Sequence, residues 1–147
     1  IALQFAAVLG SDARTRNVNF DWMEPARQVR VHINQDEARR DLPKLARIDA
    51  TVRWVSYEPA LSELDLFDTV MTKGGPRQLI EGLDWVIAGG ESGPKARPIR
   101  REWVDLLREQ CDRCGVAFFF KQWGGATATA GGCELDGAEF KAWPISA

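Results

Sequence analysis

Short apolar runs that end in polar or glycine-rich clusters are the feature that most constrains the fold of this chain. Residues 51–57, 84–88 and 116–120 are rich in β-branched and aromatic side chains, which predicts β-strands. Residues 29–33 form a fourth, shorter run. The runs alternate with helical patterns, so we predict an α/β fold with parallel strands and helical crossovers. Four such strands make either a small open sheet or half of an eight-stranded barrel.

Two segments between these runs carry helix signals. The first begins at Asn34, which suits an N-cap with Glu37 three residues on, and Pro43 is expected to kink or restart it. The second, residues 100–113, repeats apolar side chains at spacings of three and four. Gly115 then provides a typical C-terminal stop.

The remaining segments are less informative. Residues 60–83 are interpreted as a long connection with a turn at 73–76. We divide the chain into an N-terminal segment, residues 1–28, and a C-terminal α/β domain, residues 29–147.

Composition favours one domain and excludes few functions. The chain has 147 residues, of which 45% are hydrophobic, enough for one core. Its net charge of −2 gives no bulk electrostatic support for nucleic acid as a partner, although a local basic patch is compatible with it. No apolar run approaches the roughly 18 residues of a membrane span, so we expect no membrane partner. An odd count of three cysteines favours a reducing, cytoplasmic location.

Polar residues follow three of the predicted strands. Because the carboxyl ends of parallel strands meet at one edge of a sheet, we expect these residues to share one cleft. The catalytic candidates are Glu58, Glu91 and Lys121. The ligand-binding candidates are Gly89, Gly90, Ser92, Gly93, Arg97, Gln122 and Trp123.

For each candidate, both a functional role and a purely structural role are open. Glu58 suits a general base, a metal ligand or a hook for a cationic group, or it pairs with a surface arginine. The glycines around Glu91 let a backbone approach a ligand, or they form an ordinary turn. Their spacing is neither a dinucleotide fingerprint nor a P-loop. Arg97, near a helix start, suits a small anionic ligand or is a solvated charge. Lys121 either extends its ammonium group to solvent or takes part in function at the expected cleft.

The cysteines do not form an obvious metal motif. Cys111 and Cys114 make a C-x-x-C pair, but inside the second predicted helix, on its apolar face. A zinc site takes four ligands, and only Cys133 and His32 remain, both distant in sequence. We therefore expect buried thiols and no metal site in this chain.

Four motifs, in one order, resemble a known family. Residues 52–61 have the sequence VRWVSYEPAL, residues 83–98 LDWVIAGGESGPKARP, residues 118–124 FFFKQWG and residues 135–137 LDG. These segments resemble those of a phage-encoded family, the phage gene-product thirty-seven/sixty-eight proteins, which are similar to radical-SAM proteins. The resemblance is strongest over residues 51–125.

The resemblance implies a phage or prophage protein of undefined reaction, and the C-terminal half of a TIM-barrel-like, radical-SAM-like fold. It also implies S-adenosylmethionine and an iron–sulfur cluster in a full-length protein, bound through an upstream three-cysteine motif that this sequence lacks. For this chain alone we expect no cofactor and no activity without a missing N-terminal half or a partner protein. The alternatives are a non-catalytic phage-derived module that binds an anionic ligand or nucleic acid, and a truncated remnant. Half a barrel would also leave unguarded edges at the strands 29–33 and 116–120.

Overall fold

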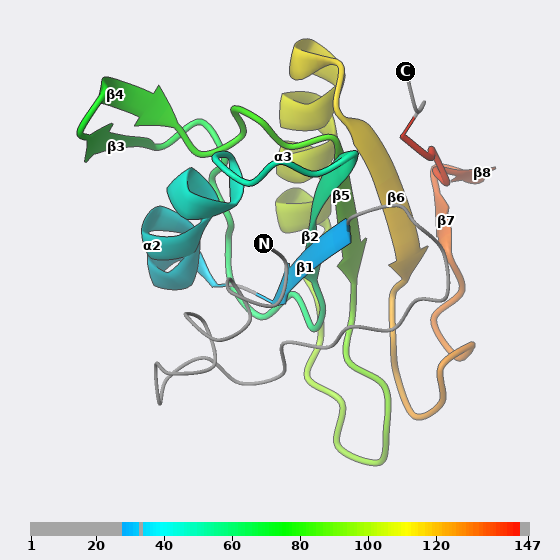
Figure 1. The fold of residues 1–147 in the computed structure, drawn as a ribbon. Coiled ribbons are helices and arrows are strands. Elements are labelled where there is room, and N and C mark those ends of the chain that lie inside the picture. Colours follow the sequence, from blue (N-terminus) through cyan, green and yellow to red (C-terminus); the bar gives the residue numbers. More distant parts are fainter. Residues whose placement is uncertain (1–27, 33, 145–147) are drawn as a thin grey trace.

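The computed structural model describes residues 28–32 and 34–144, and its class is mixed α/β, as predicted (Figure 1). The segment 1–27 and Ile33 lie outside the described residues, so most of the predicted N-terminal part does as well. The elements are β1 (Gln28–His32), α2 (Gln35–Leu45), β2 (Val52–Tyr57), β3 (Thr69–Thr72), β4 (Gly75–Gln78), β5 (Trp85–Gly89), α3 (Arg101–Cys114), β6 (Ala117–Gln122), β7 (Glu134–Leu135) and β8 (Ala138–Glu139).

Four of the strands form one parallel sheet in the order β1-β2-β5-β6. Each strand adds beside the one before it in the chain, so the sheet is wound in a single direction. The hairpin β3–β4 and the short pair β7–β8 are separate antiparallel units. The predicted parallel strands are therefore present, in an open sheet within the part of the chain that the structure describes. Helices connect β1 to β2 and β5 to β6, whereas the connection from β2 to β5 contains the β3–β4 hairpin and no helix.

The two helices among the described residues pack against the same face of this sheet. Successive side chains of a strand point to opposite faces, and the apolar residues divide accordingly. The helix-covered face carries Val55, Tyr57, Val86, Ala88, Phe118 and Phe120, packed with Ala38, Leu42 and Leu45 of α2 and Val104, Leu107 and Cys111 of α3. The opposite face carries a second cluster of Val52, Trp54, Trp85 and Ile87, with Ala117 and Phe119 against it.

The helix boundaries follow from local sequence, with one exception. Asn34 accepts a hydrogen bond from the Glu37 amide at 3.0 Å, and the Glu37 carboxylate accepts from the Asn34 amide at 2.9 Å, so the predicted capping box is confirmed. Gly115 ends α3 with a φ of 67°, also as predicted. The helix does not restart at Pro43, contrary to one of the two outcomes expected there. Pro43 lies in the last turn of α2, where its missing amide removes only one hydrogen bond before the helix ends at Leu45.

The sequence analysis missed the hairpin and mispredicted one sheet edge. The turn expected at 73–76 is the tip of the β3–β4 hairpin. The expected unguarded edge at 116–120 is wrong, because the segment 140–142 pairs with β6. The Phe120 amide donates to the Phe140 carbonyl at 2.7 Å, and the Ala142 amide donates to the Phe118 carbonyl at 3.0 Å.

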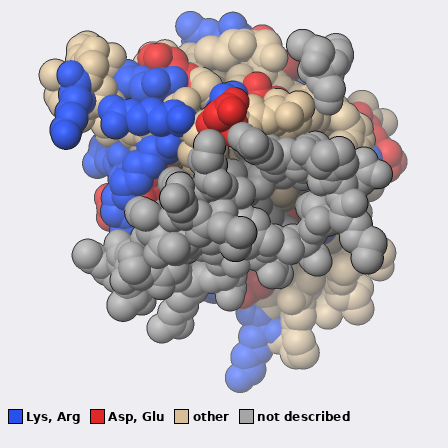
Figure 2. Space-filling model, in the orientation of Figure 1, with Lys and Arg blue, Asp and Glu red and all other residues tan. Residues whose placement is uncertain are grey.

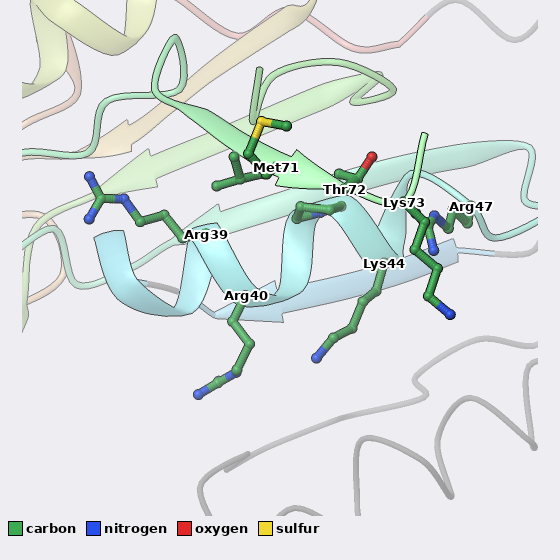
Figure 3. A pocket seen from close by; sticks show the side chains of 9 residues that line it. Arg39, Arg40, Lys44, Arg47, Met71, Thr72 and Lys73 are labelled. Atoms are coloured by element: carbon green, nitrogen blue, oxygen red, sulfur yellow. The ribbon is translucent and has the colours of Figure 1, made fainter. Parts of the chain in front are cut away.

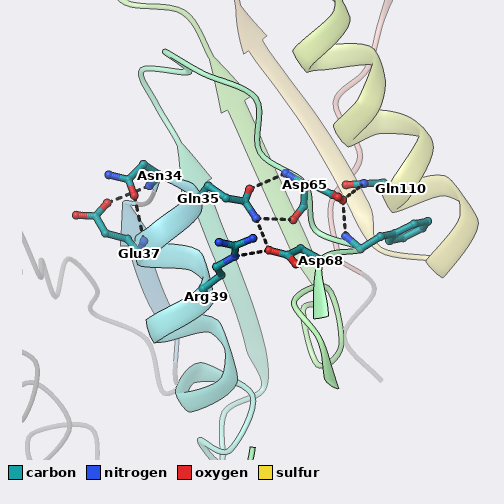
Figure 4. Close-up of polar contacts among 8 residues, drawn as sticks. Asn34, Gln35, Glu37, Arg39, Asp65, Asp68 and Gln110 are labelled. Atoms are coloured by element: carbon teal, nitrogen blue, oxygen red, sulfur yellow. Dashed lines mark hydrogen bonds and ion pairs between the residues drawn. The ribbon is translucent and has the colours of Figure 1, made fainter. Parts of the chain in front are cut away.

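A buried amide holds the connection after β2 against α3. Gln110 is only 4% exposed; its Oε1 accepts from the Leu66 amide at 2.9 Å and its Nε2 donates to Asp65 Oδ1 at 2.6 Å. From the other side, Gln35 of α2 accepts from the Asp65 amide at 2.8 Å and donates to the Asp65 carbonyl at 3.1 Å. Figure 4 shows this chain of contacts from α2 to α3. The connection is therefore fixed to both helices by polar contacts as well as by Leu64 and Leu66, which are fully buried.

No helix among the described residues is long and apolar enough to cross a membrane.

Replacement of Gln110 by leucine should destabilise the fold. The change leaves the buried Leu66 amide without an acceptor, a loss of about 1–3 kcal/mol. Chemical denaturation monitored by circular dichroism measures the free energy of unfolding. Glu109→Gln, at an exposed position of the same helix, is the matched control and should change it by less than about 0.5 kcal/mol. Equal stabilities of the two variants would contradict this role of Gln110.

Candidate functional site

Glu58 lies just beyond β2, on the face of the sheet that α2 and α3 leave uncovered. Two-residue steps along the strand place Ser56 and Glu58 on the same side as Trp54. The Ser56 hydroxyl donates to Glu58 Oε2 at 2.8 Å. Only 13% of the Glu58 side chain is exposed, so this carboxylate is held in a defined position at the strand end.

Lys121 approaches the same carboxylate from β6. Its Nζ lies 3.1 Å from Glu58 Oε1, and 53% of its side chain remains exposed. The pairing of β5 with β6 shifts here, because Ala88 pairs with Phe120 whereas Gly89 pairs with Gln122. Lys121 is thus passed over in the register, as in a β-bulge, a feature that redirects side chains near sites.

Gly89 makes room for this ion pair. A Cβ at Gly89 would lie 2.8 Å from Glu58 Oε1 and 3.4 Å from Lys121 Cβ. The Gly89 carbonyl also accepts from the Ala60 amide at 2.9 Å, which fixes the chain just after Glu58 against β5. A glycine here lets the carboxylate lie directly on the backbone of the central strand.

The backbone after β5 lies equally close to the backbone after β6. A Cβ at Gly90 would lie 2.0 Å from the Trp123 carbonyl oxygen. The Gly90 amide donates to the Gln122 carbonyl, and the Gly125 amide donates to the Glu91 carbonyl, each at 2.9 Å. The two strand-end loops therefore continue the pairing of β5 and β6 beyond the sheet.

Glu91 is held by Arg97 within its own loop. Both oxygens of the carboxylate accept from the guanidinium, at 2.7 and 2.9 Å, and the Arg97 amide donates to Oε2 at 2.9 Å. These hydrogen bonds, first those from the Arg97 side chain, lower the pKa of Glu91 from 4.5 to about 2. The charged Glu91 side chain thus stabilises the loop through Arg97, and its hydrogen bonds to other described residues are those three.

The other predicted ligand-binding residues lie around these two ion pairs. Gln122 Nε2 donates to the Ser92 hydroxyl at 2.6 Å, which links the two loops, and the Gly93 amide donates to the Gly125 carbonyl at 2.9 Å. The Trp123 indole donates to the Glu134 carbonyl at 2.9 Å, and its ring packs edge-on against Phe120. Trp123 therefore anchors the C-terminal segment to the core.

The structure brings Glu58 and Lys121 into direct contact and ties Glu91 to Arg97 instead. The sequence analysis did not select Ser56, which orients the Glu58 carboxylate. Its signal was available in the sequence, because a hydroxyl two residues before a strand-end carboxylate shares its face. A pairing between Glu91 and Arg97, six residues apart in an irregular loop, has no comparable signal.

The cysteines are arranged differently from the prediction. Cys111 is fully buried in α3, and burial raises the pKa of its thiol to about 12. Cys114 is exposed, so the expectation that both helix thiols are buried is wrong; the last turn of α3 projects beyond the core. Cys133 lies 3.0 Å from a carboxylate oxygen of Glu139. Within residues 28–32 and 34–144, no three side chains of the metal-binding types cluster.

Comparison with known proteins identifies the family. The model of DUF5131, described as a protein of unknown function, matches residues 10–144. The chain belongs to this family. No curated protein and no solved structure matches the chain significantly. The strand-end site of this DUF5131 chain is therefore interpreted from its own geometry.

Replacement of Gly90 by alanine should destabilise this DUF5131 chain strongly. The added methyl group would overlap the Trp123 carbonyl oxygen, and both partners are backbone, so no side-chain rotation relieves the overlap. We expect a loss of about 3 kcal/mol in the free energy of unfolding. In the matched control Gly74→Ala, the methyl group would meet only Thr72 Oγ1 at 3.7 Å, an ordinary contact. A Gly90→Ala variant as stable as the control would show that the loops separate readily.

The Glu91 carboxyl should titrate well below the usual range. Its lowered pKa means that the pair with Arg97 contributes stability above pH 4.5 and loses it as the pH falls towards about 2. Carboxyl ¹³C NMR of the folded chain should show Glu91 still ionised at pH 3.5. In Arg97→Gln the carboxyl should titrate near 4.5. A normal titration of Glu91 in the unmodified chain would contradict the bidentate pair.

Proposed function

We propose that the chain provides a strand-end binding site for a small zwitterionic ligand, in which Glu58 contacts a cationic group and Lys121 an anionic group. The observation that carries this proposal is the 3.1 Å ion pair between them, at the carboxyl ends of β2 and β6. A ligand that carries both charges can replace the internal pair with two pairs of its own. Its ammonium takes the place of Nζ at the Glu58 carboxylate, and its carboxylate meets the exposed Lys121 ammonium.

The position of the pair supports binding of a ligand. In parallel α/β folds, ligands bind beyond the carboxyl ends of the strands. Ser56 fixes one oxygen of Glu58, so the other oxygen faces Lys121 in a set direction. The half-exposed Lys121 side chain is able to move aside, whereas the mostly buried Glu58 carboxylate stays in place.

We further propose that the chain is the C-terminal half of a TIM-barrel-like, radical-SAM-like phage or prophage protein. Two features of the fold support this. The strands follow one another in sequence order across the sheet, and both described helices pack on the same face. A barrel has this arrangement, with helices outside and the other face inside. A doubly wound sheet instead carries helices on both faces.

S-adenosylmethionine fits the proposed ligand class, because its methionine part carries one ammonium and one carboxylate. Glu58 suits the ammonium better than Glu91 does, since both oxygens of Glu91 are taken by Arg97. An iron–sulfur cluster does not fit the described cysteines. Cys111 is buried inside the core, Cys114 is the last residue of α3, and Cys133 lies in the loop before β7. A cluster would need thiolates from an upstream segment or a partner protein.

A non-catalytic binding module remains the second candidate, and the pairing of both acidic residues favours it. Glu58 contacts Lys121 and Glu91 contacts Arg97, so each carboxylate already has a cation beside it. A general base needs an oxygen available to the substrate proton. The pairs suit charge recognition by this chain alone, and chemistry would depend on added groups.

Titration calorimetry with S-adenosylmethionine tests the zwitterion site. Glu58→Gln and Lys121→Met should each weaken binding about 10-fold, because each removes one charge-assisted contact. Lys95→Gln, which removes an exposed charge from the neighbouring loop, is the matched control and should bind as the unmodified chain does.

An analogue of the ligand without its amino group separates the two roles. It should bind the unmodified chain and Glu58→Gln equally, because its contact with Glu58 is already absent. Binding that is unaffected by either substitution, or no heat of binding at millimolar ligand, would overturn the proposed site.

A further inference from the structure

A basic hollow lies between α2 and the β3–β4 hairpin, apart from the strand-end site. Its volume is about 240 Å³. In Figure 1 the hairpin and the loop after β5 lie at opposite ends of the molecule. The lining residues are Arg39, Arg40, Pro43, Lys44, Arg47, Val70, Met71, Thr72 and Lys73. Figure 2 shows Lys and Arg side chains gathered on this side of the molecule.

The carboxylates in contact with this hollow do not neutralise it. Five of its lining residues are cationic, and among the residues that the structure describes two aspartates form ion pairs with them. Asp68 pairs with Arg39, and Asp41 pairs with both Arg40 and Lys44. The group therefore keeps a net charge of about +3 at neutral pH. Because the whole chain carries −2, all its other residues together carry −5. The chain's small net charge thus hides a strong separation of charge.

Two of the cations are available to a ligand. The side chains of Arg47 and Lys73 form no hydrogen bond or ion pair with any of the residues that the structure describes, and both residues are exposed. They come from different elements, Arg47 from the loop after α2 and Lys73 from the hairpin tip. Figure 3 shows them at one end of the hollow, with Arg39 at the other. An anion at that end would meet two positively charged side chains that form no ion pair with a described carboxylate.

The cations are spread along a line instead of converging on one point. Arg40, Lys44 and Arg47 follow one another at spacings of four and three, which places them along one stripe of α2 and its extension. At a rise of about 1.5 Å per residue, the stripe spans roughly 10 Å. A nucleic-acid strand presents its phosphates one after another, so a line of cations of this length is able to contact more than one of them. A single small phosphate would contact only part of this line.

One exposed apolar side chain borders the stripe. Met71, which also lines the hollow, is 79% exposed in β3 of the hairpin. A single thioether is able to pack on a base, but it offers too little apolar area to anchor a membrane surface, where binding grows with the apolar area inserted. The combination of a linear cation stripe and one apolar contact favours a polyanionic strand over a lipid surface.

We infer that the α2–hairpin hollow binds the phosphate backbone of single-stranded nucleic acid. Arg40, Lys44, Arg47 and Lys73 contact successive phosphates, and Met71 packs against a base. Contacts to phosphate are independent of base sequence, so the hollow binds without sequence preference. This inference does not depend on the zwitterion site at the strand ends.

Fluorescence anisotropy with a labelled 20-nucleotide single strand, as DNA and as RNA, tests the inference. The double variant Arg47→Gln/Lys73→Gln should bind at least 10-fold more weakly than the unmodified 147-residue chain in 50 mM salt. The slope of log K against log salt concentration should also become shallower by about 1.4, since each phosphate contact on a single strand contributes about 0.7. Both residues are exposed and their side chains lack described partners, so the variant should keep the thermal stability of the unmodified chain.

The matched control Lys95→Gln/Arg100→Gln also removes two positive charges, but from another surface of the chain. Its affinity should fall less than twofold. Equal losses in the two double variants would overturn the inference, because they would report net charge alone. So would the absence of binding at 50 mM salt, or binding to vesicles that contain phosphatidylserine without binding to either nucleic acid.

Discussion

The close approach of the two backbones that leave β5 and β6 is the constraint on which the strand-end site depends. Gly90 lies against the Trp123 carbonyl, and Gly124, with a φ of +80°, lies against the Glu91 carbonyl. In both contacts backbone faces backbone, so any side chain at either glycine would force the loops apart. The loops are therefore a rigid extension of the sheet, and they fix the backbone positions of Glu91 and Gln122.

The alternation of side chains along the strands determines which face of the sheet lies next to the site. Ser56, Gly89 and Lys121 follow Trp54, Ile87 and Phe119 by two residues on their strands, so the polar site continues the aromatic face. The Trp54 and Trp85 rings lie 5.3 Å apart on that face. An ion pair at the border of such an apolar surface is less screened by water than one on an exposed helix. The fold thus places Glu58 and Lys121 where their mutual attraction is stronger than on a fully exposed surface.

The sequence was most informative where the backbone follows one local rule. The strand runs, the capping box at Asn34 and the stop at Gly115 each depend on neighbouring residues, and all were predicted. The hairpin β3–β4 was missed because its strands are mostly polar and only half-buried, so they lack the apolar signal of the central sheet. Strand-end logic found Glu58 and Lys121, because parallel strands necessarily meet at one edge.

Features that depend on folded neighbours had no such local signal. The pair of Glu91 with Arg97 depends on the path of an irregular loop, and the exposure of Cys114 depends on how far α3 extends past the sheet. The basic hollow was hidden because Arg47 and Lys73 are 26 positions apart in a chain whose charges nearly cancel. Only the hairpin, an element that the sequence analysis missed, brings them together.

The contacts at the edge of β6 indicate at which edge this sheet is able to pair with an additional strand. A barrel closes through strands that pair at both edges of such a sheet. At β6 the outward backbone groups of Phe118 and Phe120 already pair with the segment 140–142. A further strand there would have to displace that segment. It would also lose the contact between the Trp85 and Trp143 rings, whose centroids lie 4.7 Å apart, and the hydrogen bond from the Trp85 indole to the Ala142 carbonyl. Extension beside β1 requires none of these losses. Since strand order follows chain order across this sheet, strands beside β1 would come from a preceding segment. Closure into the proposed barrel would in addition require the segment 140–142 to leave the edge of β6.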